Sequence, residues 1–340
     1  MAVAEATTPE RRASFGWRVA GWFVRRREAS ILVISIALFA YFSASNTVFY
    51  SGLNIKTLAE AMAPYMLICA GEVMLLICGE IDLSVGHIYA LAPIVMYVIS
   101  SPDEYGLPIW LGVILGLLAA AGIGLANGLI TTVFRVPSFI TTLGMLYILG
   151  GINLRLLHGF QVLTPGGHTF QELTAGHKLY LSSEFFWALA LVLVVQFVLS
   201  YTRWGVHTIA TGGNLLGAAE SGVNVRKIKT GNFVLAASLA GFAGILDSAR
   251  VTSTEPLQGG SSYMFFAVAG AVIGGTSLLG GAGTVMGGVL GVAMLTILQI
   301  GFIILGVNVY NFNLIIGLAI LASMILNVQI QRLKNVGRLQ

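Results

Sequence analysis

The segment Gly79-Glu80-Ile81-Asp82-Leu83-Ser84-Val85-Gly86 places two carboxylates between long apolar stretches. Only 9% of the 340 residues are charged, so these two acids stand out from their surroundings. A carboxylate at bilayer depth costs about 2.5–3.5 kcal/mol on insertion scales, and such a residue usually faces a protein-lined or wet interior. If the chain crosses a membrane, this segment is where a polar route through it is expected.

The composition places the chain among polytopic membrane proteins. Hydrophobic residues make up 56% of the sequence, whereas a soluble domain carries about 25% charged residues and this chain carries 9%. The 42 glycines fit this class because small residues let membrane helices approach closely. The net charge of +4 does not require a nucleic-acid partner, since basic residues concentrate in the inner loops of membrane proteins.

The hydrophobic pattern predicts an all-α polytopic membrane protein with about ten transmembrane helices. A spanning helix needs about 20 mostly apolar residues, and the first candidate is short but is followed by interfacial aromatic residues. The candidate ranges are 30–45, 57–78, 84–100, 109–133, 138–157, 184–200, 231–247, 262–278, 284–306 and 311–327.

The distribution of basic residues predicts that both termini lie inside. With this orientation, only Lys56, Arg155, Lys178 and Arg250 of the 18 basic residues lie outside. A cleavable signal peptide is the competing interpretation of residues 1–45, but the basic start is long and its removal would weaken this asymmetry. The predicted organisation is a cytoplasmic segment at 1–29, one transmembrane domain at 30–327 with a cytoplasmic loop at 201–230, and a cytoplasmic tail at 328–340.

Two interpretations of the acidic segment remain open. Gly79 and Gly86 bracket it, which favours a broken or re-entrant helix end in a protein-lined or wet environment. Glu72 lies two helical turns before Glu80 and is expected on roughly the same face, so Glu72, Glu80 and Asp82 would form one acidic segment. Alternatively, Glu80 and Asp82 cap the helix that starts near residue 83. Both interpretations can hold together.

The large inner loop is predicted to contain a short helix. Asn214 is a good N-cap and Gly222 a good residue just past a helix end. The residues between them are small or apolar, and a solvent-facing apolar helix indicates that something covers it. We therefore favour a docking surface for a cytoplasmic partner. In the alternative, the helix lies flat on the membrane, held by Arg226, Lys227 and Lys229.

Enzyme and cofactor signatures are absent from the sequence. It has no Walker loop, His-Glu-x-x-His or Gly-x-Ser-x-Gly motif, and the glycine run 274–283 is not followed by Gly-Lys-Ser/Thr. Tight helix packing is the favoured role for the glycines of this region. Cys69 and Cys78 are expected to be buried core residues. No metal or cofactor is predicted, because the outer-loop residues His158, His168 and His177 are too widely spaced.

Four motifs occur in order along nearly the whole chain. They are Gly-x-Ile-Asp-Leu-Ser-Val-Gly at 79–86, Val-Pro-Ser-Phe-Ile-Thr-Thr-Leu-Gly at 136–144, Gly-Gly-Asn … Ser-Gly-Val-Asn-Val … Lys at 212–229, and Gly-Gly-Thr-Ser-Leu … Gly-Gly at 274–281. With these motifs the chain resembles the membrane subunit of bacterial ABC importers for monosaccharides, the ribose/xylose/arabinose-type sugar permeases.

The resemblance implies a type II ABC-importer-like permease in the bacterial cell membrane. It further implies a homodimer of permeases, a cytoplasmic ABC ATPase with two fused nucleotide-binding domains, and an extracytoplasmic sugar-binding protein. The chain departs from the family pattern at Leu215 and Ala219 in the inner loop, which affects the choice of the partner ATPase. It also lacks the family's acidic residue in the stretch Tyr263–Val268 before the last motif, which points to a divergent substrate such as a sugar alcohol or a less common pentose. The ATPase-coupling residues would be Gly212, Gly213, Asn214, Leu215, Leu216, Ala218, Ala219, Glu220, Ser221 and Gly222.

The mechanism expected from the resemblance is alternating access driven by the ATPase through residues 211–229. The runner-up is a stand-alone ion-coupled carrier or channel for a small polar solute, with Glu72, Glu80 and Asp82 as proton or cation sites. An intramembrane enzyme is disfavoured because the sequence offers no nucleophile–base pair. The residues expected to line the solute path are Asp82, Ser84, Asn127, Ser138, Thr141 and Thr142, with Phe139 as a gate.

Overall fold

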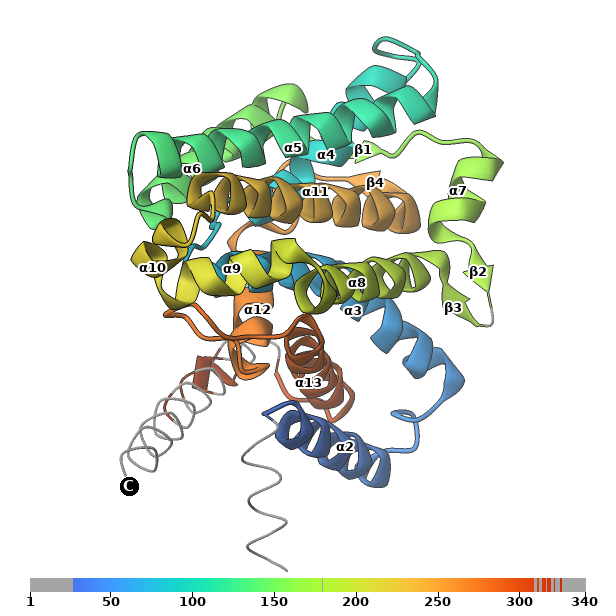
Figure 1. Ribbon diagram of the computed structural model, residues 1–340. Helices are drawn as coiled ribbons and strands as arrows, with labels where there is room; N and C mark the ends of the chain where they lie inside the picture. The colour runs from blue at the N-terminus through green and yellow to red at the C-terminus, as the bar shows by residue number, and fades with distance from the viewer. Residues whose placement is uncertain are drawn as a thin grey trace, which may run out of the picture.

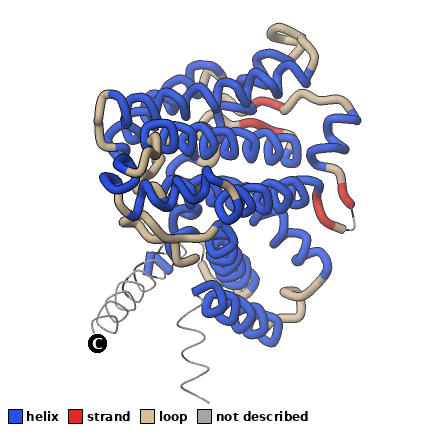
Figure 2. Tube along the Cα trace, viewed as in Figure 1, coloured by secondary structure: helices blue, strands red, loops and turns tan. Residues whose placement is uncertain are grey.

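The computed structural model describes residues 27–178 and 180–308, together with residues 311, 314, 315, 317, 318, 321 and 325. Within this part the chain is almost entirely helical, and the strands form only two short pairs (Figure 2). The predicted all-α class is confirmed. Long helices stacked in layers form the body of the molecule (Figure 1).

The helices follow the predicted order. They are α2 (Arg27–Ser45), α3 (Gly52–Ile77), α4 (Val85–Ser100), α5 (Ile109–Val133), α6 (Ser138–Leu156), α7 (His168–Ala175), α8 (Ser183–Tyr201), α9 (Arg203–Gly213), α10 (Leu215–Glu220), α11 (Val225–Val251), α12 (Gly260–Ile273) and α13 (Val285–Ile304). Strand β1 (Val162–Leu163) pairs antiparallel with β4 (Ser253–Thr254), and β2 (His177–Lys178) pairs with β3 (Leu181–Ser182).

Seven described helices are long and apolar enough to cross a membrane, namely α2, α3, α5, α6, α8, α11 and α13. Helices α4 and α12 are apolar but shorter. The tenth predicted span, 311–327, lies mostly outside the described residues, as do the segments 1–26 and 326–340. The count of ten spans therefore stays a prediction.

The bundle has two ends, which we name after α10 and α7; they lie at opposite sides of the view in Figure 1. At the α10 end, the N–H of Gly281 donates to the carbonyl of Ile77 (2.8 Å), which joins the end of α3 to the segment before α13. At the α7 end, the β1–β4 pair joins the segment after α6 to the end of α11.

Helices α4 and α11 pack closely in the centre because a proline on one meets a glycine on the other. Pro93 lies inside α4 and lacks the N–H that would bond the carbonyl of Tyr89, four residues earlier. That carbonyl is so close to α11 that a Cβ on Gly244 would lie 1.8 Å from its oxygen. Any larger residue at position 244 would therefore push the two helices apart.

The glycine-rich region at α12 and α13 has the packing role that its spacing predicts. A Cβ on Gly274 would lie 2.3 Å from the carbonyl oxygen of Gly287, and one on Gly288 would lie 2.8 Å from Sγ of Cys69. Cys69 and Cys78 are both free and buried, which confirms their prediction as core residues. Their thiols are part of the packing between helices.

The segment 201–230, predicted as a cytoplasmic loop with one short helix, is largely helical. The Thr202 hydroxyl accepts from the N–H of Gly205 (3.4 Å) and starts α9 directly after α8. The Asn224 side chain accepts from the N–H of Lys227 (3.0 Å), so α11 begins at Val225 and not at residue 231. These polar caps start the helices before the apolar stretch that the sequence pattern detects.

Candidate functional site

The short helix α10 forms as the sequence predicts. The Asn214 side chain accepts from the N–H of Gly217 (2.9 Å), which satisfies one free donor of the first turn. After the helix, Gly222 adopts a φ of 85°, a conformation that glycine takes without steric cost. The helix is therefore bounded by a polar cap and a glycine, at one edge of the molecule (Figure 1).

The outer face of α10 is apolar and uncovered. Leu216 is 75% exposed and Leu215 46% exposed, whereas Ala218 is buried against the bundle. Large exposed apolar side chains that lie together mark an interaction surface. Of the other predicted coupling residues, Gly212 instead packs inward, because a Cβ there would lie 1.8 Å from the carbonyl oxygen of Ile77. Gly213, Asn214, Ala219, Glu220, Ser221 and Gly222 are exposed beside the two leucines.

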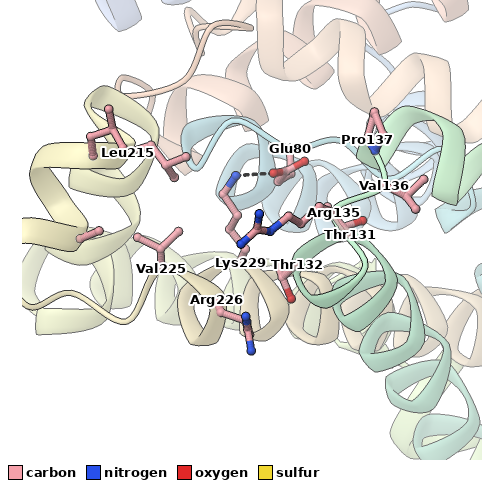
Figure 3. Close-up of a pocket in the computed structure, with 12 residues that line it drawn as sticks. Glu80, Thr131, Thr132, Arg135, Val136, Pro137, Leu215, Val225, Arg226 and Lys229 are labelled. Atoms are coloured by element: carbon pink, nitrogen blue, oxygen red, sulfur yellow. Dashed lines mark hydrogen bonds and ion pairs between the residues drawn. The ribbon is translucent and has the colours of Figure 1, made fainter.

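A pocket of about 620 Å³ opens beside α10 (Figure 3). Within it, Lys229 of α11 forms an ion pair with Glu80, the first acid of the acidic segment. Arg135 extends across the same space from the end of α5, and neither it nor Arg226 pairs with an acid among the described residues. Arg135 also has a φ of 58°, a costly conformation for a residue with a side chain. The other lining residues are Thr131, Thr132, Val136, Pro137, Leu215, Leu216, Ala219 and Val225.

The acidic segment leaves the helical conformation, as Gly79 suggested. Helix α3 ends at Ile77 and α4 begins at Val85, and Gly79 between them has a φ of 81°. Glu80 therefore lies outside α3, and the prediction that Glu72 and Glu80 share one helix face is wrong. The turn at Gly79 directs Glu80 to Lys229, while Glu72 stays inside the bundle.

Asp82 stabilises the start of α4 and ties it to α5. One carboxylate oxygen of Asp82 accepts from the N–H (2.8 Å) and the hydroxyl (2.5 Å) of Ser84. The Asn127 side chain donates to the other oxygen (3.1 Å) and to the Ser84 hydroxyl (3.0 Å). All three side chains are fully buried. Ser84 is the N-cap residue of α4 and no side chain caps the helix, so Asp82 holds the turn before the helix and does not cap its first-turn N–H groups. Glu80 forms an ion pair with Lys229.

The remaining predicted path residues belong to the first turn of α6. The Ser138 hydroxyl accepts from the N–H of Ile81 (3.4 Å), and Thr142 donates to the Ser138 carbonyl (2.8 Å). Thr141 is buried without a partner for its hydroxyl among the described residues. Phe139 is 53% exposed on the surface of α6. The structure thus brings Asp82, Ser84, Asn127 and Ser138 together and leaves Phe139 apart.

Among the described residues, Glu72 is the acid with the fewest interactions to stabilise its charge. It is fully buried in α3, and neither carboxylate oxygen has a hydrogen-bond partner in the part that the structure describes. A buried carboxyl group without partners is costly in a low-dielectric interior. Its position in the centre of the bundle makes it a functional candidate by the same argument that applies to Asp82.

A second charged cluster, at the α7 end, was missed in the sequence. Arg250 near the end of α11 bonds both Asp247 and Glu184, with 2.7 Å from its Nε to the Glu184 carboxylate. Asp247 also accepts from the Tyr89 hydroxyl and from the Gln258 side chain (3.1 Å). The sequence did contain a hint of this cluster, because Glu184 and Asp247 are acidic residues inside predicted membrane spans. No local motif surrounds them, so nothing in the sequence indicated that they lie together. The described residues contain no group of three His, Cys, Asp or Glu side chains arranged to hold a metal ion.

The comparisons with known proteins agree with this architecture. Residues 54–324 match the family described as "Branched-chain amino acid transport system / permease component". The chain belongs to this family. It is a multi-pass membrane permease and not an enzyme, so the predicted resemblance to importer permeases is confirmed. No solved structure matches the chain.

Several curated relatives cover nearly the whole chain. The xylose/arabinose import permease protein XylH of Sulfolobus acidocaldarius is 35% identical over 313 residues, which is 91% of this chain and 87% of that protein. The ribose import permease protein RbsC of Escherichia coli is 30% identical over 90% of this chain and 94% of its own length. The autoinducer 2 import system permease protein LsrC of Salmonella typhi is 30% identical over 88% of this chain and 85% of its own length.

Proposed function

We propose that this permease conducts a monosaccharide or sugar alcohol into the cell as one subunit of an ATP-driven importer, with α10 as the contact to the ATPase. The exposed leucines of α10 carry the proposal, since they form an uncovered apolar surface on a helix with fixed ends. The names of the relatives, which refer to xylose, arabinose and ribose, favour a pentose as the solute.

The positions of the basic residues support an orientation with the α10 end in the cytosol. Arg135, Arg226 and Lys229 line the pocket at the α10 end, and Arg203 and Lys227 belong to the adjoining helices α9 and α11. Only Lys56, Arg155, Lys178 and Arg250 lie on the predicted outer side, near the α7 end. Membrane proteins carry an excess of basic residues on their cytoplasmic side. A binding protein would then deliver the solute at the α7 end, and a second permease copy would complete the path. The ATPase would carry two fused nucleotide-binding domains.

In this proposal the buried polar residues near the start of α4 form a closed section of the path. The bonds from Asn127 to Asp82 and Ser84 must open before a solute passes, together with the contact of Ser138 to the acidic segment. Thr141 and Thr142 would border the same section. Phe139, on the surface of α6, would act as a gate. Movement of α10 reaches this section through Lys229 and Glu80, which join α11 to the acidic segment.

Replacing one exposed leucine on α10 tests the docking role. We expect Leu216→Asp to abolish ATP-dependent pentose uptake in proteoliposomes that contain the partner ATPase, because a charge replaces the apolar contact. The matched control is Leu163→Asp, which alters a leucine of similar exposure (79%) at the α7 end and should leave binding of the ATPase unchanged.

Three outcomes would contradict the proposal. They are ATPase binding that is unchanged by Leu216→Asp, equal loss of binding with Leu163→Asp, and solute accumulation by the purified permease without any ATPase. Measuring leucine uptake beside xylose, arabinose and ribose uptake tests the choice of sugar, because the family description refers to amino acids.

A further inference from the structure

The start of α12 is a broken helix end with free backbone donors. Gly259 and Gly260 have positive φ values of 78° and 43°, and no side chain caps the helix. The first helical hydrogen bond runs from the N–H of Tyr263 to the carbonyl of Gly259 (3.0 Å). The N–H groups of Ser261 and Ser262 therefore have no acceptor within the helix, and both serines are exposed.

This helix end lies inside the bundle and not at either of its ends. The chain at Gly260 touches Gly86 so closely that a Cβ there would lie 1.7 Å from the Gly260 carbonyl oxygen. The neighbouring His87 ring lies against Gly150 of α6, 3.7 Å from the position of a Cβ on that residue. Gly150 is about 9 Å from one end of α6 and about 18 Å from the other at 1.5 Å per residue.

Exposed polar backbone at this depth requires water or protein around it. Lipid tails offer no hydrogen bonds, so irregular backbone in the hydrocarbon region occurs only where it faces protein or a wet cavity. In transporters, substrate sites form where interrupted helices meet, with the helix N-termini pointing at the solute. Here the N-terminal turns of α4 and α12 meet at Gly86 and Gly260.

A buried histidine nitrogen that lacks a partner among the described residues lies beside the same place. His87 is only 8% exposed, and its Nδ1 atom has no hydrogen-bond partner among the described residues. The Cε1 atom bonded to Nδ1 lies 3.9 Å from the position that a Cβ on Gly260 would take. A buried polar atom that lacks a partner costs free energy, which a ligand hydroxyl can recover.

The residues around the start of α12 suit a neutral, sugar-like ring that carries several hydroxyl groups. Tyr263 of α12 stands 4.7 Å from the ring of Tyr65 and 5.0 Å from that of Tyr89, measured between centroids, and it is half-buried. Aromatic faces pack against the apolar faces of such rings. Asp247, which accepts from the Tyr89 hydroxyl, is also bonded by Arg250 and Gln258, so its charge is already compensated.

We propose that the start of α12, with His87 and Tyr263, binds a neutral polyhydroxylated solute such as a pentose during its passage. The N–H and hydroxyl groups of Ser261 and Ser262 donate to the solute, His87 bonds one hydroxyl, and Tyr263 packs against the ring. This site rests on the proposed transport function but adds a solute-contacting region that the sequence motifs did not include.

Accessibility of an introduced cysteine tests the site without requiring transport. We expect the thiol of Ser261→Cys to react with a charged methanethiosulfonate about tenfold faster than that of Ile148→Cys, because thiolate chemistry needs water. Ile148 is 56% exposed on α6, two residues from Gly150, and so samples the same depth on an apolar outer face of a helix long enough to span the membrane. The native Cys69 and Cys78 are buried and give a low background.

Protection by a solute gives the second measurement. Xylose, arabinose or ribose at millimolar concentration should slow modification of Ser261→Cys, and leucine should not. Adding His87→Ala should weaken this protection about threefold to tenfold, the effect of one lost hydrogen bond, whereas His158→Ala in the loop after α6 should not. Thermal unfolding of each variant excludes loss of the fold as the cause.

Three results would overturn the site. They are modification of position 261 as slow as that of position 148, absence of protection by any of the three sugars, and disulfide cross-linking between two copies of Ser261→Cys that sugars do not affect. The last result would assign this face to the contact between permease copies. These readouts do not involve the ATPase, so they can fail while the Leu216→Asp test of docking succeeds, and the reverse also holds.

Discussion

Helix α11 carries one charged contact at each end, and the two differ in how firmly they join the neighbouring helices. At the α7 end, Arg250 bonds Glu184 of α8 and Asp247, which also accepts from Tyr89 of α4 and from Gln258. At the α10 end, one ion pair joins Lys229 to the acidic segment. About 31 Å of helix separates the two contacts, close to the thickness of the hydrocarbon core.

The two contacts also differ in how deeply their carboxylates are buried. Glu184 and Asp247 are 0% and 3% exposed, and Arg250, which is 25% exposed, lines an adjoining pocket of about 360 Å³. Lys229 and Glu80 are 16% and 10% exposed and border a pocket of about 620 Å³. The α7 end therefore joins several elements through two buried carboxylates, and the α10 end has fewer bonds to break. An ATPase that acts at α10 would move the end of the bundle that fewer side-chain bonds hold in place.

The largest effect is expected when the α7 contact is broken. Arg250→Ala leaves two buried carboxylates without a cation, which should reduce the free energy of unfolding by about 3–5 kcal/mol. Thermal unfolding in detergent measures the loss. The control is Arg155→Ala, an exposed arginine at the same end, which should change stability little. Equal melting temperatures for the two variants would show that the cluster does not hold this end together.

A smaller effect is expected at the α10 contact. Lys229→Ala should cost about 1–2 kcal/mol, because Glu80 can reach water through the pocket and keeps part of its solvation. The charge-exchanged double variant Glu80→Lys with Lys229→Glu should recover part of the loss. Lys227→Ala, an exposed neighbour, is the control. A cost equal to that of Arg250→Ala would contradict the difference between the two ends.

The smallest effect is expected at the cap of α10. Asn214→Ala removes the acceptor for the Gly217 N–H and should cost about 1 kcal/mol, confined to α10. Hydrogen exchange of the α10 amides should then accelerate about fivefold without a change in the melting temperature. Asn46→Ala removes a comparable bond to the N–H of Val48 in the turn at the α7 end and should leave α10 exchange unchanged. Unaltered exchange in Asn214→Ala would show that other contacts hold the helix.

Local patterns in the sequence predicted the elements whose causes are local. The apolar runs predicted the long helices, Asn214 and Gly222 predicted α10, and Gly79 predicted the break after α3. These predictions were possible because helix caps and positive φ values depend on a few adjacent residues. The same reasoning failed for residues 201–230, where polar caps extend helices beyond the apolar runs. It also failed for Glu72 and Glu80, because the helix ends before the second acid.

The composition and motifs of the sequence determined the membrane class, the helix order and the family, since each depends on residue types and their order alone. Only the tertiary structure decided the partners of the charged residues: Lys229 for Glu80, Arg250 for Glu184 and Asp247, and none for His87 Nδ1. The physical reason is that the energy of a buried charge depends on atoms within a few ångströms of it. Apart from Asp247, which lies one helical turn from Arg250, those atoms lie far away in sequence, and close packing between glycines brings them together.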